Sequence, residues 1–478
     1  MTKAATFSAL RAVQRAEAVL DAGTFTPVAG VRGRVPFVVG SGFLGGAPVL
    51  IALTDGHVRG GTIGVREATL LARLAETATA GRIGGRRPAA LILGFDTGGV
   101  RVEEGPRALA AASGVGVALA RLTALGVRVA AVISGPRGCF GAPSVMAALP
   151  ERIIITADAH WGLTGPKLLG DLHAAGHTNA DGFAATSALT RLENGDAHAV
   201  VADHPEAVRT QLCDFIARVQ ASRDGRTLEQ RIVASHDITA ALRERLHRSG
   251  DGHVYAPARR TARQRDLLKY SFRGNWRPTG PRYRRGLVHA AMGFLGDTPA
   301  VTLIVGPEPA KGSGVGIEEA SLVTDMVQRA AELNQDQPAA IVTFLFCQGH
   351  AVDISQERFG VHRALAECLR ALVAARLRGH PIISVLGGGT YGAAYLSLAA
   401  PSHRILALRG TSVAPMAPQV LRAFQALKGH KPGHDAETQL AELIPDVRIV
   451  ESVIRLPRVL MEELAVLVST VKPETAPA

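Results

Sequence analysis

Continuous apolar runs alternate along this chain with segments whose apolar residues recur at helical spacing. The first pattern predicts buried strands, and the second predicts amphipathic helices. In the first half we predict strands at Ala47–Leu53, Ala89–Phe95, Val127–Ile133 and Arg152–Thr156, a helix that opens at 60–64 and runs through Ala75, and helices at Ala108–Leu125, Ser144–Leu149 and Glu206–Arg218. This order predicts an α/β fold of stacked ββα units, with sheets covered by helices.

The second half repeats this plan. It predicts strands at Ala300–Val305, Ala339–Phe346, Pro381–Leu386 and Arg404–Leu408, and helices at Glu318–Leu333 and Gly360–Leu377. Equivalent segments lie about 250 residues apart, which indicates a duplicated domain rather than short repeats. We therefore predict two tandem domains, 1–225 and 286–478, joined by a polar, basic linker or lid over 226–285.

Composition removes several classes of protein. Of the 478 residues, 47% are hydrophobic, as expected for a globular chain. No apolar stretch reaches the roughly 18 residues of a membrane helix, and the N-terminal segment lacks the apolar core of a signal peptide. Four scattered cysteines without a CxxC pair exclude a zinc ribbon, and the absence of HExxH and GxxxxGK[ST] patterns argues against a metal or ATP site. We expect a cytoplasmic protein.

The net charge of +12 is concentrated between Arg243 and Arg285. Aromatic residues interleave with these cations, but no recognised nucleic-acid motif surrounds them, so we do not predict a nucleic-acid partner. An acidic carrier protein or a nucleotide-derived phosphate would suit the charge, and a solvated interdomain linker would explain it equally well.

Two glycine-rich turns are the strongest chemical signal. Each, at 135–142 and at 387–395, follows a predicted strand and precedes a helix. Small residues there let the backbone approach a ligand, and exposed N–H groups at the start of a helix stabilise anionic oxygens. Packing against a neighbouring strand demands the same residues, but the recurrence of the turn at equivalent places favours function.

Other candidate residues are less specific. In the loop 97–105, Arg101 and Glu104 are spaced to form an ion pair, which either orients the loop or serves the chemistry. Cys139 lies within the first glycine turn, where a small buried residue is the simplest explanation. Histidines near the turns, such as His160 and His350, are more often core or surface residues than catalytic ones.

At these motifs the chain resembles a known family. The segments 60–64, 97–105 and 135–141 look like the beta subunit of biotin-independent malonate decarboxylase, and 379–385 with 403–408 looks like its gamma subunit. The resemblance implies two tandem crotonase-like, carboxyltransferase-type domains with the active site between them. It also implies decarboxylation of a malonyl thioester on an acyl carrier protein with a phosphoribosyl-dephospho-CoA arm, in a complex with a carrier-transferase subunit.

The resemblance implies that backbone amides hold the thioester oxygen in one turn and the departing carboxylate in the other. The candidate catalytic groups are Phe140, Gly141, Gly392 and Ala393, and the candidate substrate-binding residues are Gly98, Gly99, Arg101, Glu104, Gly138, Cys139 and Tyr391. No metal and no cofactor are expected on this chain, which we expect to work as a homo-oligomer or in a multisubunit complex.

Departures from the family pattern keep two alternatives open. The segment 391–395 resembles the second domain of biotin-dependent acyl-CoA carboxyltransferases, and Lys167 stands where the malonate enzyme commonly has glutamate. The first alternative is a carboxyltransferase served by biotin on a partner, since this chain has no Met-Lys-Met biotinylation motif. The second is a structural or regulatory protein that has kept the fold and lost the activity.

Overall fold

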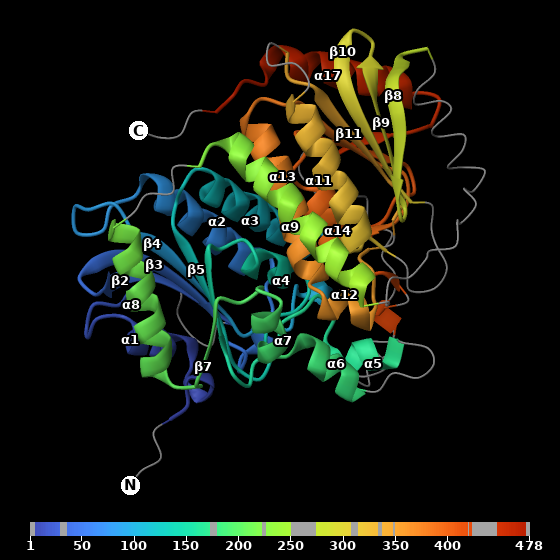
Figure 1. Cartoon of the computed structure of the whole chain (residues 1–478). Coiled ribbons are helices and arrows are strands. Elements are labelled where there is room, and N and C mark those ends of the chain that lie inside the picture. Colours follow the sequence, from blue (N-terminus) through green and yellow to red (C-terminus); the bar gives the residue numbers. More distant parts are fainter. Residues whose placement is uncertain are drawn as a thin grey trace.

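The computed structural model describes residues 5–28, 36–172, 179–221, 226–249, 274–306, 314–332, 337–347, 349–418, 420–422 and 447–474. It forms two similar halves, each built on a seven-stranded sheet (Figure 1). The first sheet contains β1 (Thr26–Pro27), β2 (Phe37–Leu44), β3 (Ala47–Thr54), β4 (Ala90–Phe95), β5 (Val129–Ile133), β6 (Arg152–Thr156) and β7 (Ala199–Val201), in that order. β1, β2 and β3 pair antiparallel, and β3 to β7 are parallel.

The second sheet repeats this topology, with an antiparallel start followed by parallel strands. Its strands, in spatial order, are β8 (Trp276–Arg285), β9 (Val288–Leu295), β10 (Thr298–Val305), β11 (Ala340–Leu345), β12 (Ile382–Leu386), β14 (Arg404–Leu408) and β16 (Val447–Val450). A separate pair joins β13 (Thr390–Tyr391) to β15 (Val413–Ala414). The repeated order confirms the duplication and the predicted fold class.

Helices fill the space between the sheets and cover their outer faces. In the first half they are η1 (Phe7–Ala9), α1 (Ala12–Val19), η2 (Arg59–Gly61), α2 (Val65–Ala80), η3 (Val102–Glu104), α3 (Gly105–Ala124), α4 (Ala142–Ala147), α5 (Pro166–Leu172), α6 (Asn179–Thr186), α7 (Ala188–Glu193) and α8 (Pro205–Ala221). Those that follow are α9 (Leu228–Arg248), α11 (Ile317–Glu332), α12 (Ile354–Arg358), α13 (Val361–Leu377), α14 (Gly392–Ala394), the π-helical turn η4 (Tyr395–Ala399) and α17 (Leu456–Thr470).

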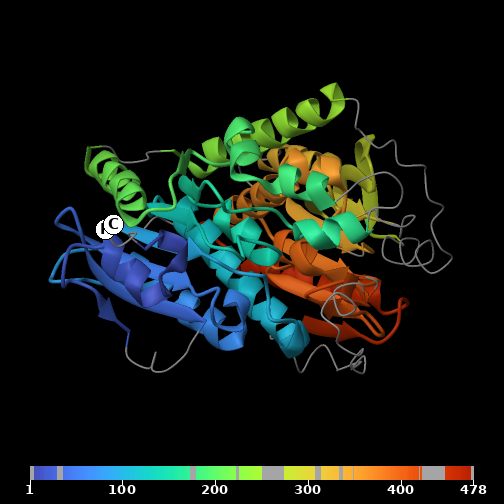
Figure 2. The ribbon, with the colours of Figure 1, turned by 90° about the horizontal axis from the view of Figure 1, so that it is seen from below.

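One large apolar core joins the two halves. It contains the inner faces of both sheets and residues of α2, α3, α9, α11 and α13, which Figure 1 shows between the sheets. Smaller cores lie on the outer faces, under α1 and α8 in the first half and under α17 in the second. The view from below in Figure 2 shows the same pairing of the halves through their helices. Because the central core is shared, the relative position of the halves is set by apolar packing.

The prediction of a linker over 226–285 needs correction at both of its ends. Helix α9 packs against α11 and α13, and its residues Ile232, Leu242 and Leu246 are buried. Strand β8 is an edge strand of the second sheet and pairs with β9. Charged residues on the exposed faces of these elements hid their periodicity. Most of the predicted basic segment, residues 250–273, lies outside the described residues.

Within the described residues, no helix combines the length and the apolar character that crossing a membrane requires.

Candidate active site

The first glycine turn joins the end of β5 to α4 and is held by backbone hydrogen bonds. The Cys139 N–H donates to His160 O, the Phe140 N–H donates to Thr97 O at 3.3 Å, and the Gly141 N–H donates to Leu163 O at 2.9 Å. The two amides predicted here as oxyanion donors, those of Phe140 and Gly141, are therefore engaged within the protein. In this structure the two amides stabilise the turn itself.

The residues that follow Gly99 and Gly141 differ from Phe140 and Gly141 in their backbone hydrogen bonding. Gly99 (φ 117°) and Gly141 (φ 67°) are neighbours, since a Cβ on Gly141 would lie in van der Waals contact with the Cα of Gly99, at 3.5 Å. The described hydrogen bonds leave the N–H groups of the next residues, Val100 and Ala142, without an acceptor. Two open amides beside two meeting glycines form a candidate oxyanion hole.

The second half repeats this geometry. Val315 pairs with His350 through the same pattern that joins Ile63 to Val100. Gly349 (φ 123°) corresponds to Gly99, and Gly392 (φ 52°) opens α14 as Gly141 precedes α4. The amides equivalent to those of Val100 and Ala142 therefore belong to His350 and Ala393. Ala393 was predicted from the sequence, and His350 was treated there as a core or surface residue.

The two turns meet at the boundary between the halves. Helix α4 lies against α14 and α13, and α3 lies against η4 and β15. The packing is close, since a Cβ on Gly116 of α3 would be 3.2 Å from Leu396 Cδ1 of η4. The structure thus brings the two predicted glycine turns together across the shared core.

The loop residues Arg101 and Glu104 form an ion pair that supports the backbone. Arg101 Nη1 lies 2.6 Å from Glu104 Oε1 and 3.1 Å from Glu67 Oε2, and Glu104 Oε2 accepts the Val65 N–H. Burial raises the pKa of Glu104, but the Val65 N–H and Arg101 outweigh burial and hold the pKa below its ordinary value. An ionised, fully engaged carboxylate orients the loop that carries Gly98 and Gly99 and is not available as a proton donor.

A buried carboxylate links the halves beside the first turn. Glu357, on α12, accepts the Leu163 N–H at 3.0 Å and the Thr164 N–H at 2.6 Å. Burial raises the pKa of Glu357 to about 7, although both of these N–H groups act in the opposite direction. Leu163 O also accepts the Gly141 N–H. Glu357 of the second half therefore helps to position the turn of the first half.

Other polar contacts cross the same boundary. Thr164 Oγ1 lies 3.0 Å from Nε2 of His350, and burial lowers the pKa of His350 to about 4, so this imidazole is neutral at pH 7. The fully buried Arg191 donates to the carbonyls of Glu357 and Arg358 and pairs with Asp196. These contacts hold the segment after the first turn against α12.

Cys139 and Tyr391, two further predicted site residues, are buried. Burial raises the pKa of the Cys139 thiol well above its ordinary value, so this cysteine is not a nucleophile at neutral pH. The Tyr391 hydroxyl lies 2.6 Å from Ser412 Oγ. Gly138 (φ 63°) admits no side chain, because a Cβ would lie 2.2 Å from His160 O. These residues shape the turns.

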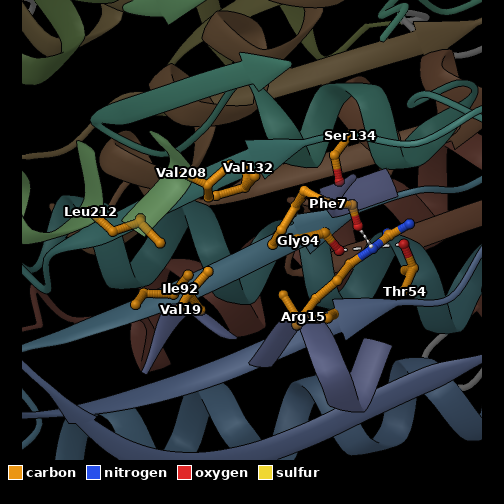
Figure 3. Close-up of a pocket in the computed structure, with 11 residues that line it drawn as sticks. Phe7, Arg15, Val19, Thr54, Ile92, Gly94, Val132, Ser134, Val208 and Leu212 are labelled. Carbon is orange, nitrogen blue, oxygen red and sulfur yellow. Dashed lines mark hydrogen bonds between the residues drawn. The ribbon is translucent and has the colours of Figure 1, made fainter. Parts of the chain in front are cut away.

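A small cavity lies under the first sheet (Figure 3). Its volume is about 10 Å³, and Phe7, Arg15, Ile92 and Leu212 are among its lining residues. This volume holds about one water molecule at most. In the same region, Arg15 Nε donates to Phe7 O. Too small for an acyl substrate, the cavity is a packing gap.

Glu357 was not predicted from the sequence, because the first half has no carboxylate at the equivalent position. The Val65 N–H binds Glu104 in the first half, and the equivalent Ile317 N–H binds Gln356 in the second. By this equivalence Glu357 corresponds to Gly105, which carries no side chain. The only signal in the sequence was the run of polar residues from Ser355 to Arg358.

Comparison with known proteins shows the family of this chain. Residues 10–428 match the carboxyl transferase domain family, and the chain belongs to that family. The carboxyl transferase subunits beta/alpha of acetyl-coenzyme A carboxylase from Saccharopolyspora erythraea are 24% identical over 419 residues, which cover 80% of this chain and 64% of that protein.

Two further relatives match shorter segments. The methylmalonyl-CoA carboxyltransferase 12S subunit of Propionibacterium freudenreichii subsp. shermanii is 29% identical over 37% of this chain and 32% of its own length. The malonyl-S-ACP:biotin-protein carboxyltransferase of Malonomonas rubra is 26% identical over 33% of this chain and 57% of its own length.

Solved structures include related folds. A chain of the Pseudomonas malonate decarboxylase MdcD–MdcE heterodimer is 30% identical, covers 51% of this chain and 96% of its own length, and has a TM-score of 0.41. The hexameric transcarboxylase 12S is 19% identical over 99% of this chain and 91% of its own length, with a TM-score of 0.38. Because these TM-scores are low, the family assignment rests on the family match.

Proposed function

We propose that this protein decarboxylates a malonyl thioester carried on an acyl carrier protein, releasing CO₂ and an acetyl thioester. The observation that carries this proposal is the pair of equivalent glycine turns, one with open amides, that meet between the halves. The names of the relatives describe reactions of thioesters such as methylmalonyl-CoA and malonyl-S-ACP. In each of these substrates a carboxylate sits on the carbon next to the thioester carbonyl.

The proposed decarboxylation follows from the hydrogen-bond donors that the two glycine turns supply. When the bond between the α-carbon and the carboxylate breaks, its electron pair moves into the thioester carbonyl and forms an enolate. The amides of Val100 and Ala142 would hold that oxygen, and each such donor contributes roughly 2.7–4 kcal/mol to the transition state. The turn at His350 and Ala393 would bind the carboxylate until CO₂ leaves, and a proton then completes the acetyl group.

The motifs of the chain favour decarboxylation over transfer to biotin. Segments 97–105 and 135–141 resemble the malonate decarboxylase beta subunit, and 403–408 resembles the gamma subunit. We accordingly propose an acyl carrier protein with a phosphoribosyl-dephospho-CoA arm and a carrier-transferase subunit as partners. The chain itself would need neither biotin nor a metal ion.

The test is CO₂ release from malonyl carrier protein or malonyl-pantetheine, with and without avidin and EDTA. Release that neither reagent reduces supports the proposal. Activity that requires carboxybiotin or a biotinylated partner would instead show a biotin-dependent carboxyltransferase, which the resemblance of 391–395 to those enzymes keeps as the second candidate. No activity with either donor would favour a protein that has lost catalysis.

One variant tests the oxyanion hole directly. Ala142 is the buried first residue of α4, where the backbone of proline is compatible with a helix, so Ala142→Pro removes the N–H, and the folding of the variant is checked before its activity. We expect kcat to fall by about 10²–10³-fold. Proline at Gly141 is a poor test, because φ there is 67°. Unchanged kcat in a folded Ala142→Pro protein would remove this amide from the mechanism.

A further inference from the structure

A second, larger cavity lies between the two halves. Its volume is about 190 Å³, and it is lined by the segments around Arg128 and Glu151 of the first half and by residues of α9 and α13. None of its lining residues belongs to either glycine turn. Arg128 immediately precedes β5, whereas the first turn follows the other end of that strand. The cavity therefore lies at the opposite edge of the sheet from the candidate active site.

The lining of this cavity is strongly basic. It contains five arginines, Arg128, Arg226, Arg231, Arg363 and Arg370, against two carboxylates, Glu151 and Glu367, which leaves an excess of three positive charges. Arg370 also donates to Leu149 O and Ala148 O, so the second half contacts the first directly beside the cavity.

Two of these arginines keep hydrogen-bonding capacity. Arg363 donates through Nε to Glu367, and Nε of Arg128 lies 2.7 Å from Glu151 Oε1. Across the described ranges, neither of the two has a hydrogen-bond partner for its Nη groups. Their side chains are only 17% and 18% exposed. Partly buried guanidinium groups with open Nη atoms match the geometry of oxyanions such as phosphate.

The volume restricts the ligand. Pockets for drug-sized molecules measure about 300–1,000 Å³, so a cavity of about 190 Å³ is too small for a nucleotide or for coenzyme A. We propose that this cavity is a binding site for a small phosphate-class dianion, either inorganic phosphate or the phosphoryl end of a small phosphate monoester, held by arginines of both halves. A bound dianion would offset most of the excess charge and hold the halves together.

The pKa shifts of two neighbouring groups agree with a positive potential. Glu367 is fully buried, and burial raises its pKa, yet Arg370 and Arg363 lower the pKa below its ordinary value. Burial together with Arg363 and Arg152 lowers the pKa of His198, which also lines the cavity, to about 4.

The test is calorimetric titration of the full chain with inorganic phosphate and with glycerol 3-phosphate, at an ionic strength held constant with NaCl. We expect saturable binding of phosphate that Arg128→Gln weakens at least tenfold. Binding of both ligands would identify the phosphoryl end of a metabolite, and binding of phosphate alone would identify the free ion. Arg226→Gln is a second variant, since this side chain is exposed and not needed for the core.

Arg458→Gln is the matched control, because Arg458 is an 86% exposed arginine on α17, outside the cavity. It should bind phosphate like the wild type. The proposal is overturned if phosphate gives no saturable heat, if neither Arg128→Gln nor Arg226→Gln weakens binding relative to this control, or if coenzyme A displaces phosphate.

Discussion

The carboxylate of Glu357 allows the link between the halves to be tested by titration. Its oxygens accept two backbone N–H groups at 3.0 and 2.6 Å in a fully buried site. Because burial raises its pKa from 4.5 to about 7, the native state holds the proton more tightly than the unfolded chain. The stability contribution of this residue is therefore fully present below about pH 4.5 and is lost as the pH rises through about 7. The difference in pKa corresponds to about 3 kcal/mol.

Glu357→Gln removes this titration. The free energy of unfolding of the wild type minus that of the variant should fall by about 3 kcal/mol between pH 4.5 and pH 8. The variant should also lose activity at all pH values, because the amide of glutamine accepts one N–H and opposes the other. A lost hydrogen bond to a charged group is worth about 1.5–3 kcal/mol, which corresponds to roughly a tenfold or larger fall in kcat if it displaces Leu163 and with it Gly141.

Urea denaturation at a series of pH values measures the first effect, and the CO₂ assay measures the second. The control is Glu332→Gln, a change of the same kind on an exposed part of α11. If the stability of Glu357→Gln follows the same pH dependence as that of the wild type, the carboxylate does not titrate as argued. If kcat is unchanged as well, Glu357 does not position the turn.

Two further predictions concern buried charge. Arg15→Met leaves the Asp96 carboxylate, now paired at 2.9 Å and fully buried, without its cation; we expect a loss of about 3–5 kcal/mol in urea denaturation, partly recovered by adding Asp96→Asn. An equal loss in the double variant would contradict this. Burial lowers the pKa of His350 from 6.5 to about 4, so its stability contribution is lost as the pH falls from 6.5 to 4. His350→Gln should remove up to about 3 kcal/mol of that dependence, and identical acid profiles would refute it.

Helices and strands in which the apolar residues follow a single clear periodicity were predictable from the sequence. The strands Arg152–Thr156 and Arg404–Leu408 have the predicted ends, because short β-branched and leucine-rich runs are bounded there by turns. Helix α9 and strand β8 were not predicted, because their exposed faces carry many arginines and only the structure shows which residues are buried. The composition of a segment averages its exposed and its buried face, so the many exposed arginines concealed the buried apolar residues.

Only those parts of the candidate site that occur in both halves were predictable from the sequence. Both glycine turns were identified from the duplication, and the structure brings them together. Which amides stay open was not predictable, because it depends on acceptors far along the chain. Leu163 O, which occupies the Gly141 N–H, comes from the segment after β6, and Thr97 O, which occupies the Phe140 N–H, follows β4. Only the packed sheet brings these carbonyls to the turn.

Duplication alone would give two identical turns, whereas the proposed decarboxylation needs two different sites. The structure shows where the halves diverge. Val100 places an aliphatic side chain beside the first turn. Its counterpart His350 places an imidazole beside the second turn, and this imidazole is held neutral by burial and contacts Thr164. Glu104, which supports the first loop, is replaced by Gln356. The added carboxylate, Glu357, reaches from the second half to the first turn. The backbone repeat therefore supplies two equivalent turns, and the side chains that break the repeat make them chemically distinct.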